Sequence, residues 1–185
     1  MDKINEAINV LNSGGVILYN TETICGLGCL TNFPKAIDKI YKIKQRDSSQ
    51  KLILLIHNEI RLNSYVRKVP EIAWDIIDYS QQQPTIIYEN AYNLSENLIS
   101  EDGSIAIRLV QSGPLHHFLS KLKTPLTSTS ANVSGKTSPL HFKEVSKEIL
   151  SKVDFILDLP NLNSSKRPSS IIKLKSNGEV KIIRE

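Results

Sequence analysis

Hydroxyl and amide side chains are concentrated in residues 126–135, where ten positions carry five hydroxyls and one amide. If residues 125–129 are extended, strand alternation places Ser128 and Ser130 on one face, and Asn132 joins them if the extended backbone continues. Gly135 then allows a turn that other residues avoid. Uncharged donors and acceptors of this kind can bind phosphate or ribose oxygens. A Ser/Thr-rich strand end that bonds to its own backbone is the alternative interpretation.

Three cationic side chains could bind an anionic ligand. Lys44 and Arg46 follow a predicted helix one residue apart, and an extended loop would let them clamp phosphates from the same side. They could equally complement the negative end of the helix dipole. Arg108 follows the apolar residues 105–107 of a predicted strand, where a cation must reach an anion or water. Either a ligand carboxylate or a structural salt bridge would suit it.

A polar turn at residues 20–23 follows the apolar run 16–19. This is the carboxyl end of a predicted strand, where open α/β sheets place ligands. Gly26 and Gly28 follow, but without a third glycine that opens a helix they do not predict a dinucleotide site. Cys25 and Cys29 are four residues apart, which suits neither a redox pair nor a four-ligand zinc site. We expect reduced structural thiols and no metal site.

Length and composition predict one globular domain over residues 1–185. The chain has 23 basic and 19 acidic residues, and the net charge of +4 fits anionic partners such as nucleotides or RNA. The first residues lack a basic region followed by an apolar core, and no apolar run reaches membrane-spanning length. We therefore expect a cytoplasmic protein that does not associate with a membrane.

Helices and strands are predicted to alternate along the chain. Helical spacing and caps predict helices over residues 3–12, 34–43, 71–79, 114–122 and 140–150. Apolar runs predict strands over residues 16–19, 52–56, 85–88, 104–109, 153–157, 170–174 and 180–183. Asn177-Gly178 should form the hairpin turn between the last two. This order is typical of an α/β fold, with a mixed, twisted open sheet and flanking helices.

Taken in chain order, these motifs resemble those of the YrdC/TsaC threonylcarbamoyl-adenylate synthase family. They are Tyr19-Asn-Thr-Glu-Thr23 before Gly26-Leu-Gly28, Lys44-x-Arg46, Ile105-Ala-Ile-Arg108, Ser130-Ala-Asn132-x-Ser-Gly135 and Ser169-Ser-Ile-Ile172. Each motif is weak alone, but the combination is specific and covers nearly the whole chain.

The resemblance implies a YrdC-like fold with a basic concave face and an ATP-dependent reaction. L-threonine and bicarbonate would be joined as a carbamate, which becomes an AMP anhydride with release of pyrophosphate. The product would supply the threonylcarbamoyl group of the modified adenosine in tRNAs reading codons that begin with A. Implied partners are therefore ATP with Mg²⁺, a downstream threonylcarbamoyl-transferase complex, and tRNA or double-stranded RNA.

The resemblance also implies roles for ten residues. L-threonine binding is assigned to Thr23, Arg108, Ser128 and Ser169. ATP binding is assigned to Lys44, Arg46, Ser130, Asn132, Ser138 and Arg184. Lys44 and Arg46 would be the catalytic cations, because they can offset charge on the departing pyrophosphate. The sequence offers no obvious nucleophile with a base beside it, which fits catalysis by positioning and electrostatics. Mg²⁺ would come with the nucleotide.

Two other functions stay open at this point. A non-catalytic RNA-binding module of the same fold would need the basic residues but not Thr23 or Ser128. A carbamoyl-transfer domain of the hydrogenase-maturation type shares the fold, but the acylphosphatase and zinc-finger regions of that protein are not expected here. Gln81-Gln82-Gln83 stands where the family usually has Pro-Gly-Pro, which puts the local turn in doubt.

Overall fold

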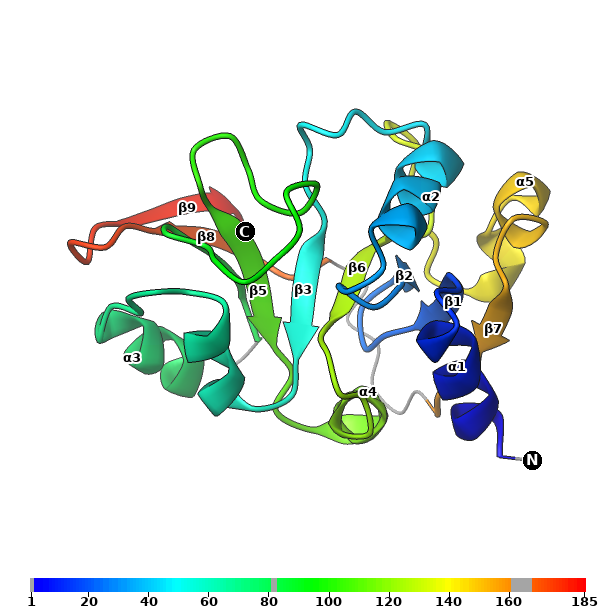
Figure 1. Ribbon diagram of the computed structural model, residues 1–185, viewed down its shortest axis with the longest axis horizontal. Helices are drawn as coiled ribbons and strands as arrows, with labels where there is room; N and C mark the ends of the chain where they lie inside the picture. The colour runs from blue at the N-terminus through cyan, green and yellow to red at the C-terminus, as the bar shows by residue number, and fades with distance from the viewer. Residues whose placement is uncertain (1, 81–82, 161–167) are drawn as a thin grey trace.

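The computed structural model describes residues 2–80, 83–160 and 168–185 (Figure 1). The helices are α1 (Lys3–Asn12), α2 (Pro34–Lys44), α3 (Ile72–Tyr79), α4 (Gly113–Ser120) and α5 (Lys147–Leu150), with 3-10 turns η1 (Glu59–Ser64) and η2 (Phe142–Glu144). The strands are β1 (Ile17–Asn20), β2 (Cys25–Gly28), β3 (Ile53–Ile56), β4 (Thr85–Tyr88), β5 (Ile105–Leu109), β6 (Leu126–Ser130), β7 (Phe155–Leu157), β8 (Ile171–Leu174) and β9 (Val180–Arg184).

The described strands form one nine-stranded sheet in the order β7-β1-β2-β6-β3-β5-β4-β8-β9. Three neighbouring pairs are parallel, namely β1 with β7, β3 with β5, and β4 with β8. The other five pairs are antiparallel. The predicted mixed α/β sheet is therefore confirmed, and β6, which carries the hydroxyl-rich segment, lies near its centre.

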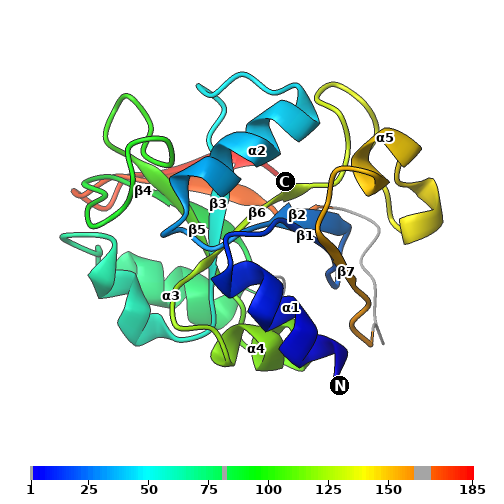
Figure 2. The same ribbon diagram turned by 45° about the vertical axis from the view of Figure 1, so that its right-hand side comes forward.

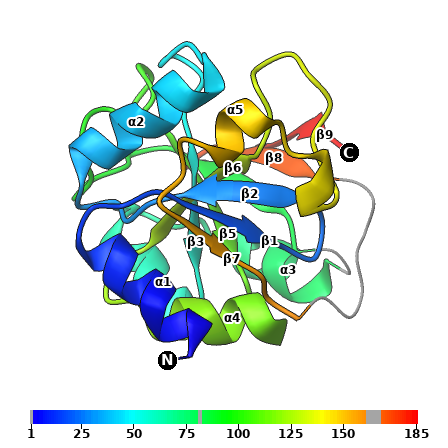
Figure 3. The ribbon, with the colours of Figure 1, turned by 90° about the vertical axis from the view of Figure 1, so that its right-hand side faces the viewer.

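Helices cover both faces of the sheet. Alternation along β1 sends Ile17 and Tyr19 to the face where α1 and α4 pack side by side (Figures 2 and 3). Leu18 faces the opposite cluster, which receives apolar side chains from α2, α3 and α5. Burying a side chain such as Leu18 contributes about 1.5–3 kcal/mol relative to leaving it exposed. Strand β1 is thus buried on both faces, which fixes the positions of the side chains at its end.

Local capping sets where the helices that support the site begin and end. The Asp2 carboxylate accepts a hydrogen bond from the Ile4 N–H at 3.2 Å, as the sequence predicts for the start of α1. Pro34 opens α2, which ends where Gln45 takes a left-handed conformation with φ 49°. Because the backbone turns at Gln45, the side chains of Lys44 and Arg46 leave the chain in different directions.

Two elements differ from the sequence-based expectation. The predicted helix over residues 140–150 is divided into η2 and α5. The Glu144 carboxylate turns back to accept from the Leu140 N–H at 2.8 Å, and the Ser146 hydroxyl caps the next turn by accepting from Ile149 N. Strand β2 was not predicted, because its Gly-Leu-Gly composition is unfavourable for a strand.

Part of the glutamine-rich departure, Gln81-Gln82, lies outside the described residues. Among the residues that are described, no helix has both the length and the apolar character needed to cross a membrane.

Candidate active site

A polar pocket of about 170 Å³ lies where the β1–β2 turn, the ends of β6 and β8, and the carboxyl-terminal arginine converge. Eight of the ten predicted site residues line it, namely Thr23, Arg46, Arg108, Ser128, Ser130, Ser138, Ser169 and Arg184. These residues come from six separate parts of the chain, so the fold brings together what the sequence leaves scattered. Lys44 and Asn132 do not line the pocket.

The charge of the pocket lining is strongly one-sided. Arg46, Lys51, Arg108 and Arg184 contribute four cations, and the lining recorded among the described residues contains no acidic side chain. Apolar walls from Ile53, Leu55 and Ile171 complete the pocket. A cavity with these walls suits a small anionic molecule that also carries an apolar group. Because ligand clefts for larger molecules measure about 300–1,000 Å³, a nucleotide would extend beyond this cavity.

Arg108 is oriented by two fixed partners. The whole residue is 6% exposed, its Nε donates to the Gln83 carbonyl at 3.1 Å, and its Nη2 forms an ion pair with the Glu22 carboxylate. No partner of Nη1 is recorded among the described residues. The structural salt bridge considered for Arg108 thus exists, and Arg108 also faces the pocket, so the two interpretations of this residue are compatible.

Hydroxyl groups from three parts of the chain line the same pocket as this guanidinium. The Thr23 and Thr21 hydroxyls are 3.0 Å apart in the β1–β2 turn. The Ser169 hydroxyl is 2.9 Å from the Thr85 hydroxyl. The Ser128 hydroxyl accepts from the buried Tyr19 phenol at 2.6 Å. Hydroxyls held in place beside a buried cation can form hydrogen bonds with the oxygen and nitrogen atoms of a small polar ligand.

Arg46 and Arg184 are held by backbone carbonyls at the rim of the pocket. Arg46 donates to Gln50 O at 2.7 Å and Lys51 O at 3.0 Å, and its Nη1 reaches the Thr129 hydroxyl at 3.0 Å. Arg184 donates to Ser169 O at 2.6 Å through Nη2. Burial lowers the pKa of both guanidinium groups, although not enough to remove their charge near neutral pH. Both are therefore fixed positive charges.

Lys44 occupies an unexpected place. It is 1% exposed, and its ammonium donates to the carbonyls of Ser130 and Asn132, the latter at 2.7 Å. Burial, followed by repulsion from Arg46, lowers the pKa of Lys44 to about 8. The sequence left two interpretations of Lys44 open, namely a side chain that clamps phosphates together with Arg46 and one that complements the helix dipole. In the structure Lys44 holds the backbone that follows β6.

Asn132 also departs from the predicted projection beside Ser130. Strand β6 ends at Ser130, so the extended geometry that would align Asn132 with the serines does not continue. The Asn132 amide donates to Val133 O at 3.0 Å and to Lys136 O at 2.6 Å. Its Oδ1 is buried, with no hydrogen-bond partner among the described residues. Such an acceptor is costly unless a ligand or water satisfies it.

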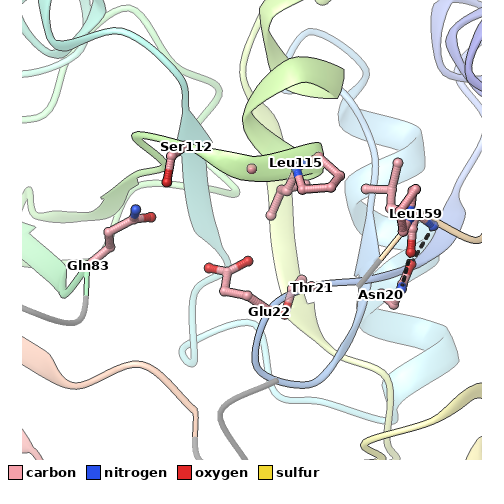
Figure 4. Close-up of a pocket in the computed structure, with 10 residues that line it drawn as sticks. Asn20, Thr21, Glu22, Gln83, Ser112, Leu115 and Leu159 are labelled. Atoms are coloured by element: carbon pink, nitrogen blue, oxygen red, sulfur yellow. Dashed lines mark hydrogen bonds between the residues drawn. The ribbon is translucent and has the colours of Figure 1, made fainter. Parts of the chain in front are cut away.

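A second cavity, of about 280 Å³, adjoins the polar pocket and shares Thr21 with it. Figure 4 shows the Glu22 carboxylate extending away from Thr21 into this space, between Gln83 and the first turn of α4. Asn20 closes one side through two hydrogen bonds to the Leu159 backbone. Glu22 therefore lines one cavity while its ion-pair partner, Arg108, lines the other.

Sequence reasoning assigned no individual role to three residues of the site. Lys51 lines the pocket, Glu22 pairs with Arg108, and Tyr19 donates to Ser128. The signal for Glu22 and Tyr19 was present, because both belong to the polar turn and the strand that precedes it. Within the described parts of the chain, no three His, Cys, Asp or Glu side chains gather so that they could hold a metal ion.

The two cysteines are free and buried. Burial raises the pKa of Cys25 to about 11 and that of Cys29 to about 12. Both therefore remain protonated at neutral pH and act as packing residues, in keeping with the absence of either from the polar pocket lining.

Comparison with known proteins gives a consistent family assignment. Residues 9–185 match the model of the Sua5/YciO/YrdC family, which carries the description telomere recombination. The threonylcarbamoyl-AMP synthase of Pseudoalteromonas translucida is 33% identical over 96% of this chain and 95% of its own length. A Methanocaldococcus jannaschii protein, whose name assigns it the same activity provisionally, is 35% identical over 94% of this chain and 80% of its own length.

Solved structures agree on the fold. P. abyssi Sua5 complexed with L-threonine superimposes with a TM-score of 0.82 at 24% identity, covering 92% of this chain. The chain spans about half of that longer protein, namely 50% of its length. E. coli YciO gives a TM-score of 0.83 at 23% identity and is covered over 88% of its length.

Proposed function

Because this chain belongs to the Sua5/YciO/YrdC family, we propose that it is an L-threonylcarbamoyl-AMP synthase. The threonine amine adds to the carbon of bicarbonate, and loss of water leaves a carbamate. A carbamate oxygen then attacks the α-phosphorus of ATP, the bond to the β-phosphate oxygen breaks, and pyrophosphate leaves. The product is a mixed anhydride of the carbamate and AMP.

The observation that carries this proposal is the polar pocket itself. Its lining combines four cations, several fixed hydroxyls and five apolar side chains in about 170 Å³. L-threonine needs a cation for its carboxylate, hydrogen-bond partners for its ammonium and hydroxyl, and an apolar contact for its methyl group. The reaction also concentrates negative charge, and the nearby guanidinium groups can stabilise it as it develops.

The amino acid is proposed to lie against Arg108. Nη1 of Arg108 faces no recorded partner among the described residues and can pair with the substrate carboxylate. Ser128, Thr23 and Ser169 would supply the surrounding hydroxyls. Ile53 also lines the pocket and would contact the threonine methyl group.

ATP is proposed to lie across the opposite side of the pocket. Arg46 and Arg184 are fixed cations of the pocket lining, and Ser130 and Ser138 add hydroxyls to the same lining. Lys44 would act indirectly, by holding the backbone carbonyls of Ser130 and Asn132 in place. The buried Oδ1 of Asn132 is suited to accept a hydrogen bond from the nucleotide.

The proposed mechanism needs no covalent intermediate with the protein. The residues hold three substrates in contact and stabilise charge, and good orientation alone can supply a large part of the rate enhancement. Mg²⁺ would be bound through the phosphates of ATP, since the recorded pocket lining offers no carboxylate. It would screen the triphosphate charge that the arginines also face.

The product is proposed to serve threonylcarbamoyladenosine modification of tRNA through a separate threonylcarbamoyl-transferase complex. A cytoplasmic location follows from that role. The basic residues at the pocket rim would also suit contact with tRNA or double-stranded RNA, since phosphates are bound by clustered arginine and lysine. We further propose that residues 1–185 work as one domain, because strands β2, β3, β5, β6, β8 and β9 of a single sheet all contribute to the pocket lining.

Threonine-dependent release of pyrophosphate tests this function. Purified protein is incubated with ATP, Mg²⁺ and bicarbonate, with and without L-threonine, and pyrophosphate is measured. The synthase proposal expects release that requires both threonine and bicarbonate. A non-catalytic RNA-binding module would bind RNA and release no pyrophosphate under either condition, so that result would reject the synthase.

A further inference from the structure

Tyr19 connects two strands that are not neighbours in the sheet. It lies on β1, its side chain is fully buried, and its phenol donates to the Ser128 hydroxyl on β6 at 2.6 Å. Strand β2 lies between β1 and β6 in the sheet order. The tyrosine ring must therefore cross β2 to make this hydrogen bond.

Two glycines of β2 make this crossing possible. Gly26 is the register partner of Tyr19, and a Cβ atom at Gly26 would lie 3.0 Å from Cζ and 3.2 Å from the hydroxyl oxygen of Tyr19. A Cβ atom at Gly28 would lie 3.1 Å from Cε1 of Tyr19 and 2.4 Å from the Thr127 carbonyl. The Gly-Leu-Gly sequence thus provides space for the Tyr19 ring and the β6 backbone.

The hydrogen bond has a defined direction. Burial raises the pKa of Tyr19 well above its ordinary value, so the phenol keeps its proton throughout the physiological range. Tyr19 is also the one recorded partner of the Ser128 hydroxyl among the described residues. A hydroxyl that accepts one hydrogen bond still has its own hydrogen to donate. Ser128 lines the polar pocket, where an acceptor on a ligand can receive that hydrogen.

We propose that Tyr19 is a positioning residue that makes Ser128 a hydrogen-bond donor toward the amino-acid substrate. By donating to the Ser128 oxygen, Tyr19 restricts the serine rotamer and directs its hydrogen into the pocket. The acceptor would be the substrate carboxylate that Arg108 attracts, because this group offers oxygen lone pairs and no competing hydrogen. This inference rests on the proposed synthase function and adds a residue that does not line the pocket.

The test compares Tyr19→Phe, Ser128→Ala and the double variant with the wild-type protein. Steady-state pyrophosphate release gives kcat and the KM for L-threonine at saturating ATP. The threonine-induced rise in melting temperature provides a second measurement that does not require turnover. Tyr88→Phe is the matched control, because Tyr88 is also buried in a strand and has no recorded hydrogen bond to another described residue.

Loss of this one hydrogen bond should raise the KM for threonine about tenfold in Tyr19→Phe, with a much smaller change in kcat. Ser128→Ala should raise the KM at least as much, and the double variant should be no worse than Ser128→Ala, because both changes remove the same interaction. Tyr88→Phe should keep the wild-type KM. The threonine-induced melting shift should shrink in Tyr19→Phe but not in Tyr88→Phe.

Three results would overturn the inference while leaving the synthase intact. The first is a wild-type KM for threonine in Tyr19→Phe, and the second is a double variant whose KM increase is the product of the two single increases. The third is an equal KM increase in Tyr19→Phe and Tyr88→Phe, which would assign the effect to general packing. If the wild-type protein releases no pyrophosphate, the proposed function fails. In that case, a threonine-induced rise in melting temperature that is the same in Tyr19→Phe as in the wild type rejects the positioning role as well.

Discussion

The Arg108 guanidinium forms an ion pair with the Glu22 carboxylate at the boundary between two cavities. The arginine side chain is 8% exposed and the glutamate side chain 36%, so the pair is buried on one side only. Without a ligand, the charge of Arg108 is therefore partly satisfied by the protein itself. A substrate carboxylate must compete with Glu22 for it or share it.

Glu22→Gln should lower the KM for L-threonine. Glutamine can still accept from Nη2 of Arg108, so the arginine keeps its orientation, but the competing negative charge is removed. Because partly exposed pairs contribute only about 0.2–1 kcal/mol, we expect a decrease of at most about fivefold. Arg108→Gln should have the opposite and larger effect. Steady-state kinetics with varied threonine measures both, and an increased KM in Glu22→Gln would show that the carboxylate charge itself is needed.

Arg46→Ala should weaken ATP use, and Lys42→Ala should not. Both are basic residues at the end of α2, but Arg46 lines the pocket while Lys42 is exposed on the helix. Loss of a charged hydrogen-bond partner costs about 1.5–3 kcal/mol, so the KM for ATP should rise by about ten- to a hundredfold in Arg46→Ala. If these residues only complement the helix dipole, both variants would instead lose a little stability and keep the wild-type KM.

The buried ammonium of Lys44 predicts a specific pH dependence of stability. Its pKa is about 8 in the folded protein against an ordinary value of 10.5, so the unfolded chain binds more protons between these limits. The contribution of Lys44 to the free energy of unfolding should therefore rise with pH from about 8 to about 10.5 and be constant below pH 8. Over that window the gain is at most about 3 kcal/mol.

Urea unfolding of the wild type and Lys44→Met from pH 6 to pH 10.5 measures this contribution. The difference in unfolding free energy should be flat up to about pH 8 and then increase in favour of the wild type. Other groups that titrate at high pH are present in both proteins and cancel in the difference. A difference that stays constant across the alkaline range would contradict the lowered pKa of Lys44.

Much of the fold follows from local signals in the sequence. The Asp2 cap, the Pro34 start of α2 and the turn at Gly178, with φ +89°, were all predicted and confirmed. Strand β2 could not be predicted in this way. Its glycines are explained by the Tyr19 ring and the Thr127 carbonyl, which are contacts between distant segments. Local propensity contains no information about such contacts.

The site shows the same division between local and distant information. Arg108 and Ser128 could be singled out from residue type and strand alternation alone. Ser169 and Arg184 required the family resemblance, because nothing in their neighbourhoods along the chain brings them to the β1–β2 turn. Lys44 looked like a ligand-binding cation, yet the carbonyls that hold it belong to Ser130 and Asn132, more than eighty residues away.

The pocket predicts a preference for threonine over serine. Serine keeps the hydroxyl, ammonium and carboxylate contacts but lacks the methyl group that Ile53 and Leu55 can contact. A missing methyl group in an apolar pocket costs about 1–3 kcal/mol, so serine should be a detectable substrate with kcat/KM lower by about ten- to two-hundredfold. Parallel pyrophosphate assays with the two amino acids give this ratio, and equal values would remove these side chains from the threonine site.

The most direct measurement is mass spectrometry of the nucleotide product formed from ATP, L-threonine and ¹³C-labelled bicarbonate. We predict a species with the mass of threonylcarbamoyl-AMP that carries the label from bicarbonate and appears together with an equal amount of pyrophosphate. It should require all three substrates and be nearly absent with Arg108→Gln. ATP consumption that yields only AMP or ADP, with no labelled product containing threonine, would contradict the assignment.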